Sequence, residues 1–118
     1  MKNILDNFGI GIDISDIDKF KKIPFETNKD FYKKLFNESE IKYCLKFKHP
    51  YSHFAGKFAL KEATKKSINH SISMKKIKSS HSNSKPKISI INKKKYSFMA
   101  SLSHENNLAV AVVISTTV

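Results

Sequence analysis

A helical pattern from about residue 53 to residue 68 constrains the fold of this chain more than any other stretch. Phe54, Phe58 and Lys61 follow one another at i, i+4 and i+7, which is the spacing of one face of an α-helix. Glu62 stands beside them as a lone carboxylate among several lysines. Such a face can hold a divalent metal ion and the phosphates around it. The pattern therefore predicts a long helix that carries both core and charged side chains.

A second lone carboxylate follows the apolar run near the N-terminus. Residues 8–12 alternate glycine with large apolar side chains and lead to Asp13, which predicts a buried strand. Magnesium is usually held by one or two carboxylates together with substrate phosphates. Asp13 and Glu62 come from distant segments with lysines nearby, so together they predict a magnesium–pyrophosphate site.

Polar residues at the spacing of helix starts, each followed by apolar side chains, indicate further helices. The expected helices begin at Ser15, paired with Asp18; at Thr27, paired with Asp30; at about Glu38, ending near Lys48; and at about His53, capped by Ser52.

The second half of the chain changes to short runs typical of strands. The expected strands cover residues 71–77, 87–91, 96–103 and 108–115, with a polar loop at 79–84 and a turn at 104–107. One strand, then helices, then mostly strands indicates the α+β class. We therefore predict a single α+β domain over residues 1–118, in which helices pack on a mostly antiparallel sheet.

Composition limits the class of protein further. A chain of 118 residues, 40% of them hydrophobic, is expected to form one domain with a small core. Cys44 is the single cysteine, which excludes an internal disulfide and fits a reducing compartment. The sequence contains no run of eighteen apolar residues and no recognisable signal peptide. We therefore expect a cytoplasmic protein that does not span a membrane.

The charge is strongly basic and comes entirely from lysine. The net charge is +12, and a field of this size attracts polyanions such as nucleotides, nucleic acid or an acidic protein. Compositional drift towards lysine, with solvated charge doing little, explains the same number equally well. The absence of arginine argues against sequence-specific DNA reading, in which arginine contacts to guanine are the commonest.

Four motifs in order resemble a known family. They are Gly9–Ile14, then Phe58–Ala63 with Lys66, then Ser84–Pro86, then Ser101–His104. Together they resemble holo-acyl-carrier-protein synthase, the short type of 4′-phosphopantetheinyl transferase, over about residues 8–114. The resemblance implies a phosphopantetheinyl transferase fold over residues 1–118 and transfer of phosphopantetheine from coenzyme A to a serine of apo acyl carrier protein. The other product would be adenosine 3′,5′-bisphosphate.

The resemblance also implies roles for the acidic and basic residues singled out above. Asp13 and Glu62 would hold Mg²⁺, and Glu62 would act as the base that takes the serine proton, as a metal ligand, or as both. Lys66 would be the lysine on the phosphate side. Lys66 lies at i+4 from Glu62, so an ordinary surface Glu–Lys pair, worth about 0.2–0.5 kcal/mol, is the alternative.

Further residues would contact coenzyme A or the carrier protein. Solvated lysines, an ordinary loop and a structural histidine are the alternatives for these positions. The remaining histidines, at positions 49, 53, 70 and 81, show no metal-ligand spacing and receive no role. The expected coenzyme A contacts are Lys57, Lys61, Lys85, Pro86, Ser103 and His104, and the expected carrier contacts are Lys19 and Lys22.

The family implies a homotrimer with active sites between subunits, so the expected partners are apo acyl carrier protein, coenzyme A and further copies of this chain, without nucleic acid or membrane. The chain departs from the family after Lys66, where residues 67–70 replace a glycine-rich turn. Two alternatives therefore stay open. One is a homologue that binds coenzyme A or a carrier without turnover. The other is a basic nucleic-acid-binding module, whose bases would stack on Tyr32, Tyr43, Tyr51, Phe54 and Phe58.

Overall fold

A three-stranded antiparallel sheet and a small hairpin form the β part of the fold. The computed structural model describes residues 3–91 and 95–117. The sheet has the strand order β1-β5-β4, and β2 pairs with β3 as a separate hairpin. The strands of the sheet and of the hairpin all pair in antiparallel fashion. The strands are β1 (Phe8–Asp16), β2 (Ile77–Ser82), β3 (Lys85–Ile90), β4 (Tyr96–Glu105) and β5 (Leu108–Thr117).

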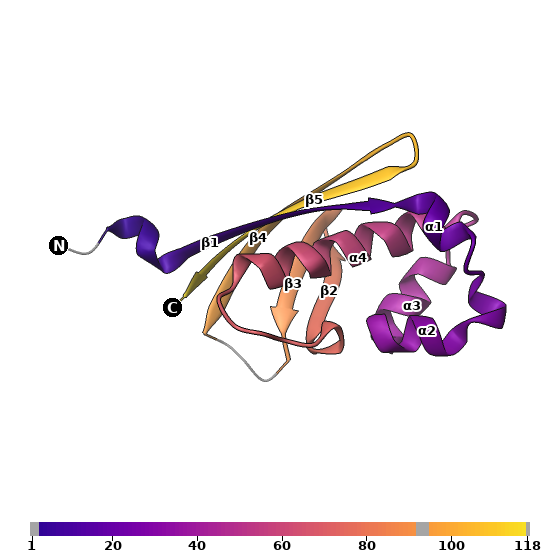
Figure 1. The fold of residues 1–118 in the computed structure, drawn as a ribbon, viewed down its shortest axis with the longest axis horizontal. Helices are drawn as coiled ribbons and strands as arrows, with labels where there is room; N and C mark the ends of the chain where they lie inside the picture. The colour runs from indigo at the N-terminus through magenta and orange to yellow at the C-terminus, as the bar shows by residue number, and fades with distance from the viewer. Residues whose placement is uncertain (1–2, 92–94, 118) are drawn as a thin grey trace.

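One long helix and three short ones accompany the strands. Figure 1 shows the long helix α4 running beside β1, with the three short helices gathered near one of its ends. The predicted α+β class, with helices packed on mostly antiparallel sheet, is therefore confirmed. The α-helices are α1 (Ile17–Lys21), α2 (Lys29–Leu35), α3 (Glu38–Leu45) and α4 (Pro50–Ser67), and the 3₁₀ turns are η1 (Ile4–Asn7), η2 (Phe25–Thr27) and η3 (Met74–Lys76).

The two glycines of β1 let α4 approach the strand at backbone distance. A Cβ atom added to Gly9 would overlap the carbonyl oxygen of Ser67, and one added to Gly11 would overlap that of Ala63. Since every other residue carries a Cβ atom, only glycine permits this contact. The alternating glycines therefore set the distance between the strand that carries Asp13 and the helix that carries Glu62.

Aromatic side chains fill the space between α4 and the short helices. Tyr32, Phe36 and Phe54 are almost completely buried, and the ring centroids of Tyr32 and Phe54 lie 4.6 Å apart. The Tyr32 hydroxyl donates to the carbonyls of Ile23 at 2.6 Å and Phe20 at 3.2 Å. This buried phenol therefore has hydrogen-bond partners, and it holds the segment after α1 against α2.

The face of the main sheet that points away from α4 is apolar and exposed. Ile10, Ile12 and Ile14 of β1 are 69%, 56% and 62% exposed, and Met99 of β4 is 72% exposed. Ile10 and Met99 share one register row through Ile114 of β5. Among the described elements, the helices lie on the other face of this sheet (Figure 1). This arrangement leaves an apolar face, which we call the open sheet face: Ile10, Ile12, Ile14 and Met99.

Several predicted boundaries differ from the structure. Ser15 is a buried residue of β1, and Asp16 caps α1 by accepting a hydrogen bond from the amide of Asp18. Helix α4 starts at Pro50, because proline is well suited to the first turn, and Ser52 lies inside it. Helix α2 starts at Lys29, after Asn28.

The first strand of the small hairpin was also predicted too early. Residues 71–77 were expected to form a strand, but β2 starts at Ile77 and continues through the predicted polar loop to Ser82. Asn83 and Ser84 join β2 to β3 with φ angles of 53° and 66°, the left-handed conformation of a two-residue hairpin turn. Asn-Gly is the usual signal for such a turn, so Asn-Ser was missed.

Where the structure describes the chain, no helix has both the length and the apolar character needed to cross a membrane.

Candidate functional site

Asp13 and Lys66 meet where α4 packs on β1. The Lys66 ammonium donates to Asp13 Oδ1 at 3.1 Å and to the carbonyl of Ile12 at 3.0 Å. The Asp13 carboxylate is mostly buried, whereas the Lys66 side chain is half exposed. The structure therefore brings together two of the predicted site residues, and it places a cation beside the predicted metal ligand.

Glu62 flanks the same contact between strand and helix. Gly11 of β1 packs on Ala63 of α4, Asp13 follows Gly11 by two residues, and Glu62 immediately precedes Ala63. Glu62 Oε1 lies 3.9 Å from Lys65 Nζ, and the Glu62 side chain is partly exposed. A pair so distant and so accessible to water contributes little, which leaves the Glu62 carboxylate available to a ligand.

The donor set at this contact fits a hard divalent cation that shares substrate phosphates. Over residues 3–91 and 95–117, no group of three or more His, Cys, Asp or Glu side chains gathers closely enough to hold a metal ion. Asp13 and Glu62 are two carboxylates, and magnesium typically takes one or two of them together with phosphate oxygens and water. These residues therefore suit a metal that arrives with a phosphorylated substrate better than a permanently bound one.

Lys57 and Lys61 do not lie on a solvated helix face. Their exposed fractions are 1% and 0%. Lys61 Nζ donates to Glu40 Oε1 at 2.6 Å, and Lys57 Nζ donates to the Ser79 hydroxyl at 3.0 Å. Because Lys61 has a buried carboxylate partner and no exposed surface, its predicted contact with a coenzyme A phosphate would require the pair with Glu40 to open.

Lys57 is in a different position, because its charge is not matched. Within the described residues, no carboxylate lies at ion-pair distance from Lys57, and its ammonium sits 4.6 Å from the centroid of the Tyr43 ring. Burial lowers the pKa of Lys57, while Cys44 and Glu40 raise it. A buried cation without a carboxylate is costly, and the hydrogen bonds to Ser79 together with the Tyr43 ring offset part of that cost.

His53 and His81 lie around the Tyr43 ring that also contacts Lys57, with ring centroids 6.0 Å and 4.8 Å from that of Tyr43. His104 adjoins Gly56, the residue before Lys57. Burial is the main cause that lowers the pKa of His53, followed by the charges of His104 and Lys57. Burial, then Lys57 and His53, lower the pKa of His81. His104 Nε2 lies 3.1 Å from the carbonyl oxygen of Ser52. We call His53, His81, His104 and Lys57 the histidine group.

No local sequence signal assigns a role to His53 or His81. His53 lies on α4, His81 on β2 and His104 on β4, so only the tertiary fold brings them together. Their grouping near a lysine that has no carboxylate at ion-pair distance among the described residues favours a phosphate ligand.

The remaining predicted coenzyme A contacts lie on strands. Lys85 and Pro86 begin β3, and Pro86 is the register partner of His81. Ser103 lies near the end of β4 and is paired with Val110. Pro86 therefore adjoins the histidine group through β2, whereas Ser103 precedes His104 on the exposed end of β4.

The predicted carrier contact Lys19 lines an apolar cavity of ≈ 370 Å³. Phe20, Phe31 and Phe58 contribute apolar walls to this cavity. Lys22 ends α1 at its C-cap position. A cation beside an apolar hollow suits an acidic protein surface that also presents an apolar side chain.

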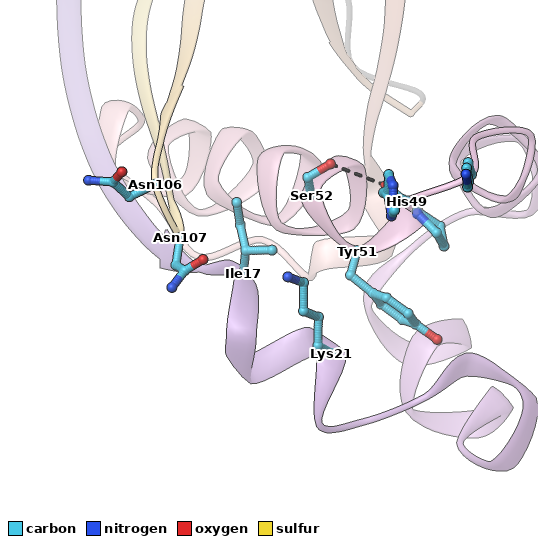
Figure 2. A pocket seen from close by; sticks show the side chains of 9 residues that line it. Ile17, Lys21, His49, Tyr51, Ser52, Asn106 and Asn107 are labelled. Atoms are coloured by element: carbon cyan, nitrogen blue, oxygen red, sulfur yellow. Dashed lines mark hydrogen bonds between the residues drawn. The ribbon is translucent and has the colours of Figure 1, made fainter.

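A second cavity, of ≈ 390 Å³, lies between α1, the start of α4 and the β4–β5 turn. Figure 2 shows Lys21 and Tyr51 on one side of it and Asn106 and Asn107 on the other. Ile17 anchors the turn here, because its amide donates to the Asn107 carbonyl at 2.7 Å. The lining combines cationic and amide groups, which suits a polar or anionic ligand.

The residues expected to stack nucleic-acid bases are largely occupied inside the protein. Tyr32 and Phe54 are completely buried in the aromatic core, and Phe58 packs against the same core. Tyr51 is partly buried against the same core, with its ring centroid 6.2 Å from that of Phe54, and its hydroxyl accepts from the Phe25 amide at 2.9 Å. The structure therefore contradicts a stacking surface built from these side chains.

Comparisons with known proteins identify the family of this chain. A family model described as the 4′-phosphopantetheinyl transferase superfamily matches residues 9–113. A holo-[acyl-carrier-protein] synthase from Thermodesulfovibrio yellowstonii is 36% identical over 111 residues, which cover 92% of this chain and 97% of that protein.

Solved structures show the same fold. The Helicobacter pylori holo-[acyl-carrier-protein] synthase in complex with coenzyme A has a TM-score of 0.77 at 36% identity, covering 91% of this chain and 99% of that one. The Bacillus anthracis holo-(acyl-carrier-protein) synthase in complex with CoA (3′,5′-ADP) has a TM-score of 0.79 at 26% identity, covering 93% and 96%. The resemblance and fold expected from the sequence motifs are therefore confirmed.

Proposed function

The chain belongs to the 4′-phosphopantetheinyl transferase superfamily, as an enzyme of the holo-[acyl-carrier-protein] synthase type, and from this premise we propose a magnesium-dependent reaction. Phosphopantetheine passes from coenzyme A to a serine hydroxyl of apo acyl carrier protein, and adenosine 3′,5′-bisphosphate leaves. The observation that carries the proposal is the contact of Asp13 with Lys66 across β1 and α4, with Glu62 beside it.

The reaction exchanges one phosphorus–oxygen bond for another. The serine oxygen attacks the phosphorus on the pantetheine side of the pyrophosphate, and the bond from that phosphorus to the bridging oxygen breaks. The bonding electrons leave with adenosine 3′,5′-bisphosphate, and the serine proton goes to a base. Little covalent work falls to the protein in such transfers, so positioning and charge stabilisation dominate.

Asp13 and Glu62 would hold Mg²⁺ together with the pyrophosphate. When bound, the ion supplies charge neutralisation to the phosphate oxygens. Glu62 is the more exposed of the two carboxylates, so it can also take the serine proton directly or through water. Lys66, now on Asp13, can turn its ammonium to the pyrophosphate because its side chain is half exposed.

Lys57, Lys85, Pro86, Ser103 and His104 would contact coenzyme A. The support is the histidine group, where the Lys57 ammonium has no carboxylate at ion-pair distance among the described residues. Coenzyme A carries a phosphate monoester as well as a pyrophosphate. Two separated cationic regions, one at the histidine group and one at Lys66, match these two phosphate groups.

Lys19 and Lys22 would meet the acidic surface of the carrier protein. Charge pairs of this kind accelerate encounter and fix orientation more than they add affinity. Their contribution should therefore weaken as salt screens the charges. The apolar cavity beside Lys19 gives the same surface a place for an apolar side chain of the carrier.

Copies of this chain are the third proposed partner. The open sheet face is too apolar to suit exposure to water, because contiguous apolar patches mark interaction sites. We propose that it is covered by further copies of the chain in a homotrimer, with active sites between subunits. The single thiol, Cys44, is buried and unpaired, which is compatible with the proposed cytoplasmic location.

Intact-mass analysis tests the proposed activity. Apo acyl carrier protein is incubated with this chain, coenzyme A and Mg²⁺, and the expected result is a mass gain of one phosphopantetheine per carrier. The gain should vanish with a chelator and return with added Mg²⁺. Retained binding of coenzyme A without any mass gain would instead support the homologue that binds without turnover.

A further inference from the structure

The carboxylate of Glu40 is buried and has no part in the proposed chemistry. Its exposed fraction is 1%, and it accepts four hydrogen bonds. Oε1 accepts from Lys61 Nζ at 2.6 Å and from the Asn37 amide at 2.7 Å. Oε2 accepts from the Ser79 amide at 2.9 Å and from the Ser79 hydroxyl at 2.6 Å.

These bonds join three elements that are distant in the chain. Glu40 lies on α3, Lys61 on α4 and Ser79 on β2. A second bond repeats the connection, because the Asn37 side-chain amide donates to the Ile77 carbonyl at 3.2 Å. The start of α3 is therefore fixed to both the long helix and the small hairpin.

Each connected element carries part of the proposed coenzyme A site. Lys61 immediately precedes Glu62 in α4. Ser79 stands two residues before His81, and residues at i and i+2 share one face of a strand. His81 in turn is the register partner of Pro86. The position of the hairpin relative to α4 therefore sets where the histidine group and Pro86 stand relative to Glu62.

Stability alone does not explain a buried ion pair at this place. Desolvation of both charges offsets much of their attraction, and well-packed apolar pairs of similar volume are often as stable. A carboxylate at this position accepts four directional hydrogen bonds from defined atoms, whereas an apolar side chain accepts none. Such bonds fix orientation, which matters where two cationic regions must match two phosphate groups.

We propose that Glu40 is a positioning residue, whose carboxylate holds the β2–β3 hairpin in register with α4 so that the two phosphate-binding regions fit coenzyme A. The inference rests on the proposed coenzyme A site but concerns a contact outside it. Glu40 touches no substrate. Its effect on the reaction passes through Ser79 and Lys61.

A pair of double variants separates positioning from stability. Glu40→Leu with Lys61→Met removes both charges and every acceptor for Ser79. Glu40→Gln with Lys61→Met removes the same charges but keeps an amide oxygen that can accept from the Ser79 amide. Both remove the Glu40 and Lys61 charges together, so neither member of the pair is left charged without the other. The measurements are urea unfolding, KM for coenzyme A, kcat, and amide hydrogen exchange over β2 and β3.

Positioning predicts that the Leu/Met variant has a KM for coenzyme A raised about tenfold or more, because misplaced binding groups cost up to about a hundredfold. Its hairpin amides should exchange faster, while kcat changes little. The Gln/Met variant should return KM close to the wild-type value. A purely structural role would instead lower the folded fraction, which reduces apparent kcat at unchanged KM. Wild-type KM and wild-type hairpin exchange in the Leu/Met variant would overturn the proposal.

Two controls keep the test decisive. If the Leu/Met variant does not fold, Ser79→Ala keeps the Glu40–Lys61 ion pair and removes the hydroxyl that bonds both Glu40 and Lys57, and an unchanged KM in that variant counts against positioning. Tyr32→Phe removes buried hydrogen bonds to Phe20 and Ile23 that involve neither Glu40 nor the hairpin, so it should lower stability at constant KM. If the wild-type chain shows no turnover, the proposed function fails, whereas hydrogen exchange still decides whether Glu40 holds the hairpin.

Discussion

Gly11 packs so closely on Ala63 that a methyl group at Gly11 would overlap the Ala63 carbonyl oxygen. The obstacle is helix backbone, which cannot turn aside as a flexible side chain can. The contact fixes the separation of β1 and α4 and, with it, the separation of Asp13 from Glu62. Local backbone geometry and the proposed metal site therefore depend on the same glycine.

Gly11→Ala is expected to destabilise the protein by about 1–3 kcal/mol or more, the cost of overpacking a tight contact. Urea unfolding followed by circular dichroism measures it. Gly56→Ala is the matched control, because its added Cβ would meet Leu102 at 3.0 Å and His104 at 3.1 Å, both at side-chain atoms. Equal stability losses in the two variants would contradict the backbone explanation.

Asp13→Asn and Glu62→Gln are each expected to abolish most of the magnesium-dependent modification while the fold survives. Each substitution would remove one ligand of the metal ion. Because charge stabilisation by the metal is worth several kcal/mol, the rate should fall at least about a hundredfold. Intact-mass time courses at several Mg²⁺ concentrations measure the loss. Glu26→Gln is the control, because this exposed carboxylate makes only a 3.9 Å pair with Lys29. Full activity of either site variant would remove the assigned metal role.

Lys57 and Lys61 are both buried, but they should respond oppositely to the same substitution. Lys57→Met removes a desolvated cation that has no carboxylate partner, so it should stabilise the fold by about 1 kcal/mol. Lys61→Met leaves the buried Glu40 carboxylate without its partner and should cost about 3–5 kcal/mol.

The same Lys57→Met variant should bind coenzyme A more weakly. If Lys57 meets a phosphate, its loss should raise KM for coenzyme A about tenfold, as expected for one hydrogen bond to a charged group. Calorimetric titration measures the binding of coenzyme A, and urea unfolding measures the change in stability. A variant that is more stable and binds coenzyme A normally would show that Lys57 does not contact the ligand.

The sequence was most informative where one segment decides its own structure. Alternating Gly9 and Gly11 indicated β1, helical spacing indicated α4, and each element carries the carboxylate assigned to it. The burial of Lys61 could not be predicted in this way, because its partner Glu40 is 21 residues away and a lysine inside a helix normally faces water. Likewise, Asn83 and Ser84 adopt left-handed backbone conformations that glycine would have signalled.

The histidine group predicts a particular dependence of stability on pH. The pKa of His81 in the folded protein is lowered, first by burial and then by Lys57 and His53, whereas the unfolded value is about 6.5. Below that pH the unfolded chain therefore binds more protons than the folded one, and stability falls as pH decreases. His81 also stacks on Tyr43, with ring centroids 4.8 Å apart.

His81→Phe should keep the stacking and remove the titration. Urea midpoints measured between pH 7.5 and 5.5 should fall less in this variant than in the wild type. His49→Phe serves as the control, since His49 lies outside the histidine group. If the urea midpoints of wild type and His81→Phe fall equally with pH, protonation of His81 does not destabilise the folded protein.

The open sheet face predicts self-association through β1. Ile12 lies at its centre, in one register row with Val112 of β5 and Ser101 of β4, and a polar side chain there would be buried without partners in an assembly. Light scattering should give the wild type about three times the chain mass of 13.5 kDa and give Ile12→Asn the mass of one chain.

Because the active sites are proposed to lie between subunits, transferase activity should disappear with the assembly, although Asp13 and Lys66 are untouched. Leu45→Asn changes an apolar residue that is 41% exposed on α3, away from the sheet, and should leave mass and activity unchanged. A wild-type chain that is monomeric and fully active would overturn both the trimer and the shared site.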